Sequence, residues 1–286
     1  MSRGAVRLAT PQSVRNVKLK VLNHLGIPPT GLTSSSPLGD WFSLELQQII
    51  WIVVCVAIAA FAQSLAGFGF SLLSVPLMVL VLAPRDAIVV SVLVASVSTT
   101  TQAFADRRFT EWKTVRRLSL LSYAGMPFGL IVFNVVSERA LRFGLGAVVL
   151  VATVLIIRKF QIPDDARRYD WILGFISGVL NTSTSTNGPP LVFLLKSRSM
   201  DASTFRATLN TVFSIANIGA LVLFFGSGKM NQDNVIGAAF ALPALAISLR
   251  IGYSMRKRVH EDAFTTLVAG LMLLSGASAL IAALTQ

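Results

Sequence analysis

Apolar residues fall in eight long blocks separated by short polar segments. The blocks cover about residues 45–82, 86–105, 117–136, 139–158, 170–197, 203–226, 233–252 and 263–284. Most are about 20 residues long, which as a helix crosses a hydrocarbon core of ~30 Å. They lack the alternation of a lipid-facing strand, and within one such segment only a helix satisfies its own backbone. The pattern predicts an all-α, polytopic transmembrane helical bundle.

The first and fifth blocks are too long for a single crossing, and each is interrupted. The first is broken by Ala-Gly-Phe-Gly at 66–69, and the fifth by a ten-residue stretch of Asn, Ser, Thr, Gly and Pro at 181–190. Each interrupted block stands at the head of a group of four. We therefore expect each group to open with a broken or re-entrant helix.

Similar residues recur at an offset of 114–116 positions. The pairs are Pro76 and Pro190, Asp86 and Asp201, Gln102 and Asn217, and Pro127 and Pro243. This register predicts two homologous transmembrane repeats, 45–158 and 170–286. They are joined by a basic linker, 159–169, and preceded by a tail, 1–44.

Basic residues concentrate in the segments 106–117, 158–168 and 250–258, whereas the counterparts near 227–232 and 137–142 carry few. Cytoplasmic loops are enriched in Lys and Arg, so all three rich segments are expected in the cytoplasm. That placement requires the two halves to be inverted relative to each other. It also requires each interrupted block to turn back to the side from which it entered, and it puts the basic tail outside.

Composition agrees with a membrane protein. Of 286 residues, 53% are hydrophobic and 13% charged, against about 25% charged residues in soluble domains. The net charge of +12 comes without an aromatic-basic motif, so no nucleic-acid partner is expected. The tail lacks the central apolar run of a secretory signal. A disordered basic tail is the simplest interpretation, with a lipid-surface helix or an organellar presequence as alternatives.

Acidic residues are missing from the middle of the apolar blocks. All 13 lie in the tail, in loops or at block ends, whereas cation carriers and proton relays need a carboxylate inside the bundle. Cys55 is the single cysteine, and the two histidines, His24 and His260, lie in polar segments. We therefore predict no metal site, no cofactor and no catalytic residues, and the protein is not expected to be an enzyme.

The two interruptions are the candidate binding site. A helix that restarts inside the membrane presents free N–H groups with partial positive charge. The polar and glycine residues beside the breaks could bind an oxyanion: Gln63, Gly67, Gly69 and Ser71 in the first, and Ser185, Thr186, Asn187 and Gly188 in the second. The alternative is structural: glycines allow close packing, and hydroxyls bond their own helix carbonyls.

Arg206 is the third candidate. It follows Asp201, which with Ser203 and Thr204 can cap the sixth block. A planar guanidinium suits a bidentate clamp on sulfite, a sulfonate or a carboxylate. The alternative is an interfacial arginine that snorkels to headgroups or pairs with Asp201. Gln102 and Asn217 are interpreted as helix–helix hydrogen-bonding residues.

Three runs of residues resemble the TauE/SafE family of membrane permeases, also called sulfite exporters. They are Ala-Gly-Phe-Gly-Phe-Ser at 66–71 with Val-Pro-Leu at 75–77, Asn-Gly-Pro-Pro-Leu-Val at 187–192, and Phe-Arg-Ala-Thr-Leu at 205–209. The resemblance covers about residues 45–284. Many members carry a Gly-rich triplet in both breaks, which this chain lacks. The resemblance implies movement of sulfite, sulfoacetate or other sulfur-containing or organic anions.

Together these observations predict a secondary transporter for a small anion in the cell membrane, with the bacterial inner membrane as the expected location. The lipid bilayer and the anionic substrate are its expected partners, and the oligomeric state is left open. The alternatives are a channel or carrier for a neutral solute and a membrane accessory subunit that moves no cargo.

Overall fold

The computed structural model describes residues 46–158, 169–198 and 200–255, and seven positions of the last predicted helix. Those positions are Gly270, Met272, Leu273, Gly276, Ala277, Ala279 and Leu280. The predicted tail, 1–44, nearly all of the linker and most of the last apolar block lie outside the described residues.

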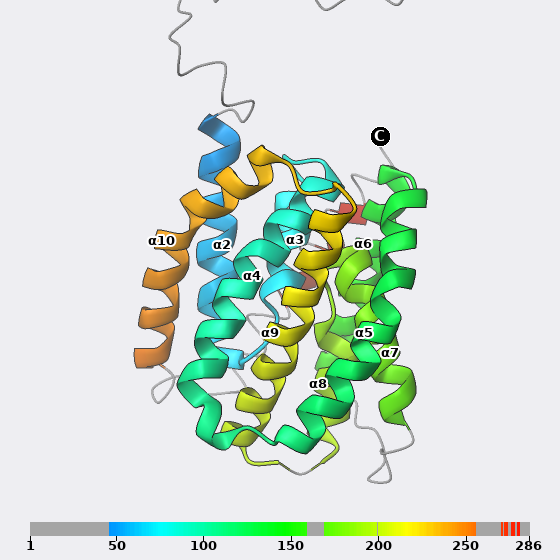
Figure 1. The fold of residues 1–286 in the computed structure, drawn as a ribbon. Helices are drawn as coiled ribbons and strands as arrows, with labels where there is room; N and C mark the ends of the chain where they lie inside the picture. The colour runs from blue at the N-terminus through cyan, green and yellow to red at the C-terminus, as the bar shows by residue number, and fades with distance from the viewer. Residues whose placement is uncertain are drawn as a thin grey trace, which may run out of the picture. The chain divides into compact units, whose positions relative to one another are not determined.

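Every regular element among the described residues is helical (Figure 1). In chain order they are α2 (Leu46–Ala66), α3 (Phe70–Met78), α4 (Pro84–Asp106), the short 3₁₀ turn η2 (Arg107–Phe109), α5 (Trp112–Val135), α6 (Glu138–Ile157), α7 (Tyr169–Thr184), α8 (Gly188–Lys196), α9 (Ala202–Gly226) and α10 (Gln232–Met255). Six of them, α2, α4, α5, α6, α9 and α10, are long and apolar enough to span a membrane. The predicted class, a polytopic helical membrane protein, is confirmed.

Both interrupted blocks form re-entrant hairpins. After the break at residues 67–69, α3 returns to the end of the molecule where α2 began, and the Trp51 indole donates to the Leu77 carbonyl oxygen at 2.8 Å. After the break at residues 185–187, α8 likewise returns, and Arg198 beyond its end pairs with Asp170 in the first turn of α7. Each hairpin therefore leaves on the side from which it entered.

The two hairpins enter from opposite ends. At one end, the Asn234 amide donates to Asp86 at 2.8 Å, joining the start of α4, which follows α3, to the start of α10. At the other end, Arg198 donates to Thr114 at 2.8 Å, joining the end of the second hairpin to the start of α5. The two hairpins thus have opposite orientations, while the inversion and the duplication of the predicted repeats both stay predictions.

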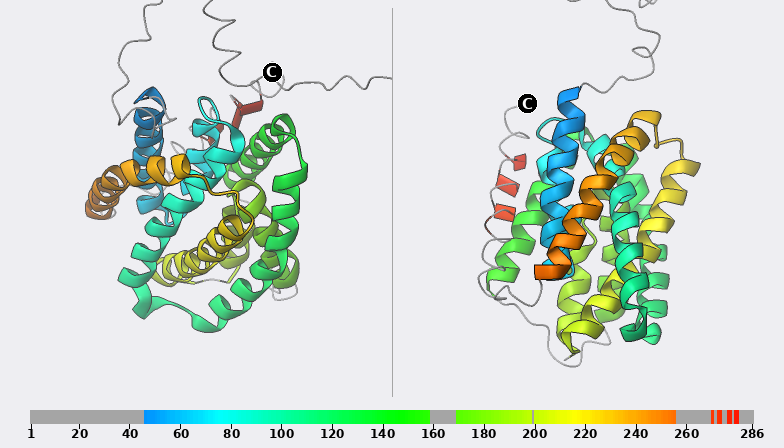
Figure 2. Two further views of the ribbon diagram at one scale, coloured as in Figure 1. Left: turned by 45° about the horizontal axis from the view of Figure 1, so that its top comes forward. Right: turned by 90° about the vertical axis from the view of Figure 1, so that its left-hand side faces the viewer.

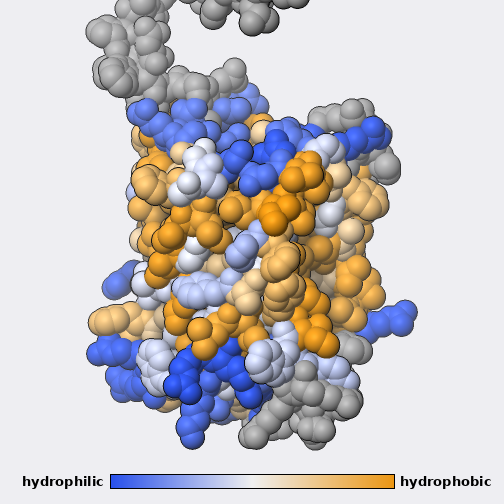
Figure 3. All heavy atoms as spheres, turned by 45° about the vertical axis from the view of Figure 1, so that its right-hand side comes forward, coloured by the Kyte–Doolittle hydropathy of each residue, from blue (hydrophilic) through white to orange (hydrophobic). Residues whose placement is uncertain are grey.

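The second of these ends carries most of the basic residues and is called the basic end below. Described Lys and Arg residues close to the helix ends there include Arg107, Arg108, Lys113, Arg116, Arg117, Arg158, Lys196 and Arg198. Figure 3 shows hydrophilic residues at both ends and a largely hydrophobic band between them. By the positive-inside rule we expect the basic end to face the cytoplasm.

Helices of one predicted repeat pack mainly against helices of the other. The closest helix pairs are α5 with α7, α2 with α10, and α4 with α9, and the right-hand view of Figure 2 shows α2 beside α10. In each pair one helix comes from residues 46–157 and the other from residues 169–255. Small residues allow this proximity: a Cβ built on Gly178 of α7 would lie 1.9 Å from the Ser122 carbonyl oxygen of α5.

The second break is shorter than predicted. Only Ser185, Thr186 and Asn187 are non-helical, because α7 continues to Thr184 and α8 begins at Gly188. The hydroxyls of Ser183 and Thr184 donate to carbonyl oxygens four residues earlier, at 2.7 and 3.0 Å. The structural interpretation of the hydroxyls therefore holds for this part of the stretch, since they satisfy their own helix.

Candidate functional site

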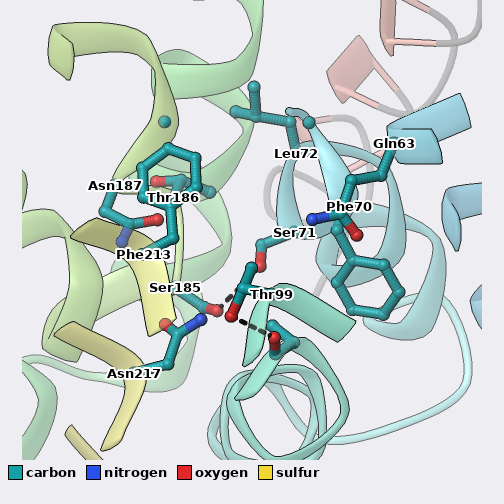
Figure 4. A pocket seen from close by; sticks show the side chains of 13 residues that line it. Gln63, Phe70, Ser71, Leu72, Thr99, Ser185, Thr186, Asn187, Phe213 and Asn217 are labelled. Atoms are coloured by element: carbon teal, nitrogen blue, oxygen red, sulfur yellow. Dashed lines mark hydrogen bonds between the residues drawn. The ribbon is translucent and has the colours of Figure 1, made fainter. Parts of the chain in front are cut away.

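A small cavity lies where the two breaks meet (Figure 4). Its lining combines polar groups from both hairpins with apolar walls: Gln63, Gly69, Phe70, Ser71, Leu72, Ala95, Thr99, Ser185, Thr186, Asn187, Gly188, Phe213 and Asn217. Among these lining residues there is no charged side chain. The cavity volume of about 20 Å³ leaves room for about one water molecule.

The first break supplies backbone donors. Gly67 and Gly69 have φ of 83° and 97°, a conformation that L-residues with a Cβ adopt with difficulty. Gly69 is the N-cap of α3, and the first amide bonded back to it is that of Leu73, at 3.2 Å. The N–H groups of Phe70, Ser71 and Leu72 therefore have no carbonyl partner within the helix. They form the positive end of α3 at the cavity wall.

The second break supplies mainly side-chain donors. The N–H groups of Ser185 and Thr186 already bond to Asn181 and Leu180, at 3.0 and 3.2 Å, and close the end of α7. The next helix begins Gly188-Pro189-Pro190, and proline has no N–H. Free backbone N–H groups at a helix start are therefore found at α3. The second hairpin contributes hydroxyl and amide side chains instead.

A chain of serine hydroxyls connects the two breaks. Ser185 donates to Ser71 at 3.1 Å, and Ser91 of α4 also donates to Ser71, at 3.2 Å. Ser74 lies 3.0 Å from Ser91, and both are fully buried. Ser74 and Ser91 were not predicted as site residues. Each is a lone hydroxyl inside an apolar run, and such a pattern does not identify a hydrogen-bond partner.

Ser185 holds an unusual backbone conformation. Its φ of 59° makes it the one non-glycine residue with positive φ among the described residues. A left-handed residue with a Cβ costs about 1 kcal/mol or more. Glycine is usual at this position after a helix, so a serine here places a hydroxyl at the cavity at some cost in stability.

Gln63 is oriented by its neighbours in α4. The Ser98 hydroxyl donates to the Gln63 side-chain oxygen at 2.6 Å, and the Gln102 amide donates to Ser98 Oγ at 3.2 Å. This leaves the NH₂ group of Gln63 as its donor toward the cavity. Gln102 was interpreted as a helix–helix residue. Its side-chain amide donates to the carbonyl and hydroxyl oxygens of Ser98 in its own helix, and it reaches α2 through Ser98.

Buried polar atoms without partners gather near the second break. Within the described residues, the side-chain nitrogen of Asn187 and both side-chain polar atoms of Asn181 have no hydrogen-bond partner. Asn187 is only 7% exposed and lines the cavity. Buried amides are normally satisfied, so an unpartnered donor here is a free position for a bound acceptor. Asn217, interpreted as a helix–helix residue, also lines the cavity (Figure 4).

The structure brings seven of the nine predicted site residues together. Gln63, Gly69 and Ser71 lie on the first hairpin, and residues 185–188 on the second. Gly67 and Arg206 are not part of the lining. They contact each other instead, because a Cβ built on Gly67 would meet the aliphatic stem of Arg206. Arg206 lies four residues into α9, on the basic-end side of the first break.

Sequence comparison relates the chain to known membrane proteins. A stretch of 102 residues, 35% of this chain, is 28% identical to the probable inner membrane transporter protein TsaS of Comamonas testosteroni and covers 43% of that protein's length. No solved structure matches the chain. The sequence profile of the family described as sulfite exporter TauE/SafE matches residues 52–279. The match includes both hairpins and the cavity between them, and the chain therefore belongs to the TauE/SafE family of membrane permeases.

Proposed function

We propose that the protein is a secondary transporter for a small anion, with sulfite, an organosulfonate or a related sulfur-containing or organic acid as cargo. The observation that carries the proposal is the hydrogen bond between Ser185 and Ser71, 3.1 Å long. It joins two re-entrant hairpins from opposite ends at one buried polar cavity. Broken helices that meet inside the membrane are a recurrent way to hold a substrate at mid-depth.

The donors of the cavity favour an anion. The α3 amides carry partial positive charge, and the Asn187 side-chain nitrogen and the Gln63 NH₂ group can only donate. Hydroxyls such as that of Ser71 can turn to donate to whichever oxygen is present. A sulfite or sulfonate group presents three oxygen acceptors, which several converging donors can share. No lining carboxylate opposes the negative charge.

The cavity volume indicates a closed state. A space for about one water cannot hold an anion with three oxygens, so binding requires the hairpins to separate. The Arg- and Lys-rich basic end would raise the local concentration of anions before that step. The relative from Comamonas testosteroni is named an inner membrane transporter, and we place this chain in the bacterial inner membrane as well.

Uptake into proteoliposomes tests the proposal. Radiolabelled sulfite, and sulfoacetate in parallel, should accumulate faster than in empty vesicles. Ser71→Ala should raise the KM about tenfold, because a hydrogen bond to a charged group is worth about 1.5–3 kcal/mol. Ser96→Ala is the matched control, since Ser96 is a buried α4 serine that bonds the Val92 carbonyl of its own helix. Uptake that is absent, or equally changed in both variants, contradicts the proposal.

A carrier for a neutral solute is the second candidate, because the cavity lining contains no charged side chain. The two candidates differ in their response to voltage. Translocation of an uncompensated anion is driven by about 2.3 kcal/mol per 100 mV, whereas uptake of a neutral solute is indifferent to voltage. A substrate-induced current on a solid-supported membrane, reversed in sign with the anion gradient, supports the anion. Uptake without current and without pH dependence favours the neutral solute.

A further inference from the structure

An open groove lies on the outside of the bundle between α5 and α9, away from the cavity. Its volume is about 620 Å³, and its walls are mainly apolar. We propose that this groove binds one anionic phospholipid, with the phosphate at the basic end. The proposal is independent of which cargo the protein moves.

Polarity changes in steps along the groove. Lys113 and Arg116 lie at its mouth, Ser119 follows one turn further, and Leu120 and Ile215 line the deeper part. From residue 113 to residue 120 a helix rises about 10 Å. This order of cation, hydroxyl and hydrocarbon matches the order of phosphate, glycerol ester and acyl chain in a phospholipid. Basic pockets between transmembrane helices on the cytoplasmic side suit anionic headgroups.

The cations at the mouth are available to a ligand. Within the part of the chain that the structure describes, neither Lys113 nor Arg116 forms an ion pair, and both are exposed. Arg117, the next residue, differs because it is paired with Asp170. Trp112, 60% exposed, lies at the same level, as expected for an aromatic residue at a membrane interface.

The buried hydroxyl of Ser119 is evidence for a ligand that does not depend on the two cations. It is only 5% exposed, and its hydroxyl has no hydrogen-bond partner among the described residues. A serine inside a helix normally bonds a carbonyl of the preceding turn, as Ser96 and Thr99 do. An unsatisfied buried hydroxyl that lines an apolar groove costs free energy unless a ligand supplies an acceptor. An ester carbonyl one turn below a phosphate would supply it.

Lipid binding to the purified full-length protein tests the assignment. In native mass spectrometry from detergent, dioleoyl phosphatidylglycerol should be retained more tightly than dioleoyl phosphatidylcholine. The double variant K113Q/R116Q should weaken phosphatidylglycerol binding about fivefold for each charge removed, and Ser119→Ala by about fivefold. The matched control is R107Q/R108Q, which removes the same charge at the same end from residues that do not line the groove. Equal retention of both lipids, or an equal loss in the control, overturns the proposal.

A second measurement leaves Lys113, Arg116 and Ser119 unchanged, and its one variant, Trp112→Phe, serves only to identify the signal of Trp112. Phosphatidylglycerol brominated on its acyl chains should quench the fluorescence component that Trp112→Phe removes, at lower mole fractions than brominated phosphatidylcholine. Identical quenching curves for the two lipids would show a groove that does not select the headgroup, contrary to the proposal.

Discussion

The aliphatic stem of Arg206 lies directly against the α-carbon of Gly67. A Cβ built on Gly67 would come within 2.4 Å of Arg206 Cγ and 2.8 Å of Cδ. An arginine near the start of α9 thus packs against the first break without lining the cavity.

Gly67→Ala should lower stability through two separate terms. One is the positive φ of 83°, and the other is the clash with Arg206. In an Arg206→Ala background the clash is removed and the φ term remains. A double-mutant cycle on Tm should therefore give a coupling of about 1 kcal/mol or more between the two sites.

Gly69→Ala is the control for that cycle. Its φ of 97° is equally demanding, but a Cβ there meets no atom within 4 Å. We expect a loss from strain alone, of about 1 kcal/mol, with no coupling to Arg206→Ala. Coupling of the same size at both glycines would show that the Gly67–Arg206 contact is not its origin.

Two substitutions of Ser185 separate the effect of its strained backbone from the effect of its hydroxyl group. Ser185→Gly removes the hydroxyl and relieves the positive φ, so Tm should stay unchanged or rise, by up to about 1 kcal/mol in stability. Ser185→Ala removes the hydroxyl and keeps the strain. Both should raise the KM for the transported anion by a similar factor. If Ser185→Gly transports like the wild type, the hydroxyl takes no part in cargo binding.

Asp170 is fully buried and pairs with two arginines, Arg117 and Arg198. Asp170→Asn leaves both cations without a counter-charge and should cost about 2 kcal/mol or more. The Arg117 side chain is 40% exposed and that of Arg198 is 15% exposed. The loss of Tm should therefore decrease in the order Asp170→Asn, Arg198→Gln, Arg117→Gln. A different order would mean that burial does not set the strength of this cluster.

Gly178 tests the close approach of α5 and α7. A methyl group there would overlap the Ser122 carbonyl oxygen, so Gly178→Ala must push two helices apart, at a cost of about 3 kcal/mol. Gly144→Ala in α6 meets no atom within 4 Å and should be neutral or gain about 0.5 kcal/mol from helix propensity. Thermal unfolding in detergent measures both, and a comparable effect of the two substitutions would contradict the packing argument.

Asp201 gives a pH-dependent prediction outside the membrane-spanning segments. It caps α9, and hydrogen bonds from the Ser203 hydroxyl first, and then from Thr204, hold the pKa of the Asp201 carboxyl well below its usual value. Its contribution to stability is therefore complete above the unfolded-state pKa of about 3.9 and is lost as pH falls toward the lower folded-state pKa. The Tm difference between wild type and Asp201→Ala should be constant from pH 7 to pH 5 and shrink below about pH 4. A difference that grows on acidification would refute this sign.

Much of this structure could be predicted because lipid makes hydrophobicity decisive. Seven apolar blocks became helices or hairpins close to their expected limits, and Asp201 caps α9 as predicted. The offset of 114–116 residues between the predicted repeats was less informative about helix limits. Asp201 precedes its helix, whereas its counterpart Asp86 is the third residue of α4. The length of the second break was overestimated, because hydroxyls such as that of Thr184 bond their own helix. Partners such as Ser91 could not be identified, since a hydrogen bond between helices depends on their packing.

The packing of helices from one predicted repeat against helices of the other also constrains how the chain inserts during synthesis. α2, at Leu46–Ala66, packs against α10, at Gln232–Met255, so it leaves the ribosome long before its partner exists. At roughly 5–20 residues per second, the earlier helix waits tens of seconds inside the bilayer with one face uncovered. One face of α2 therefore stays uncovered by the rest of the chain during that interval. Two fragments divided within the predicted linker, 159–169, should regain function when they are produced together.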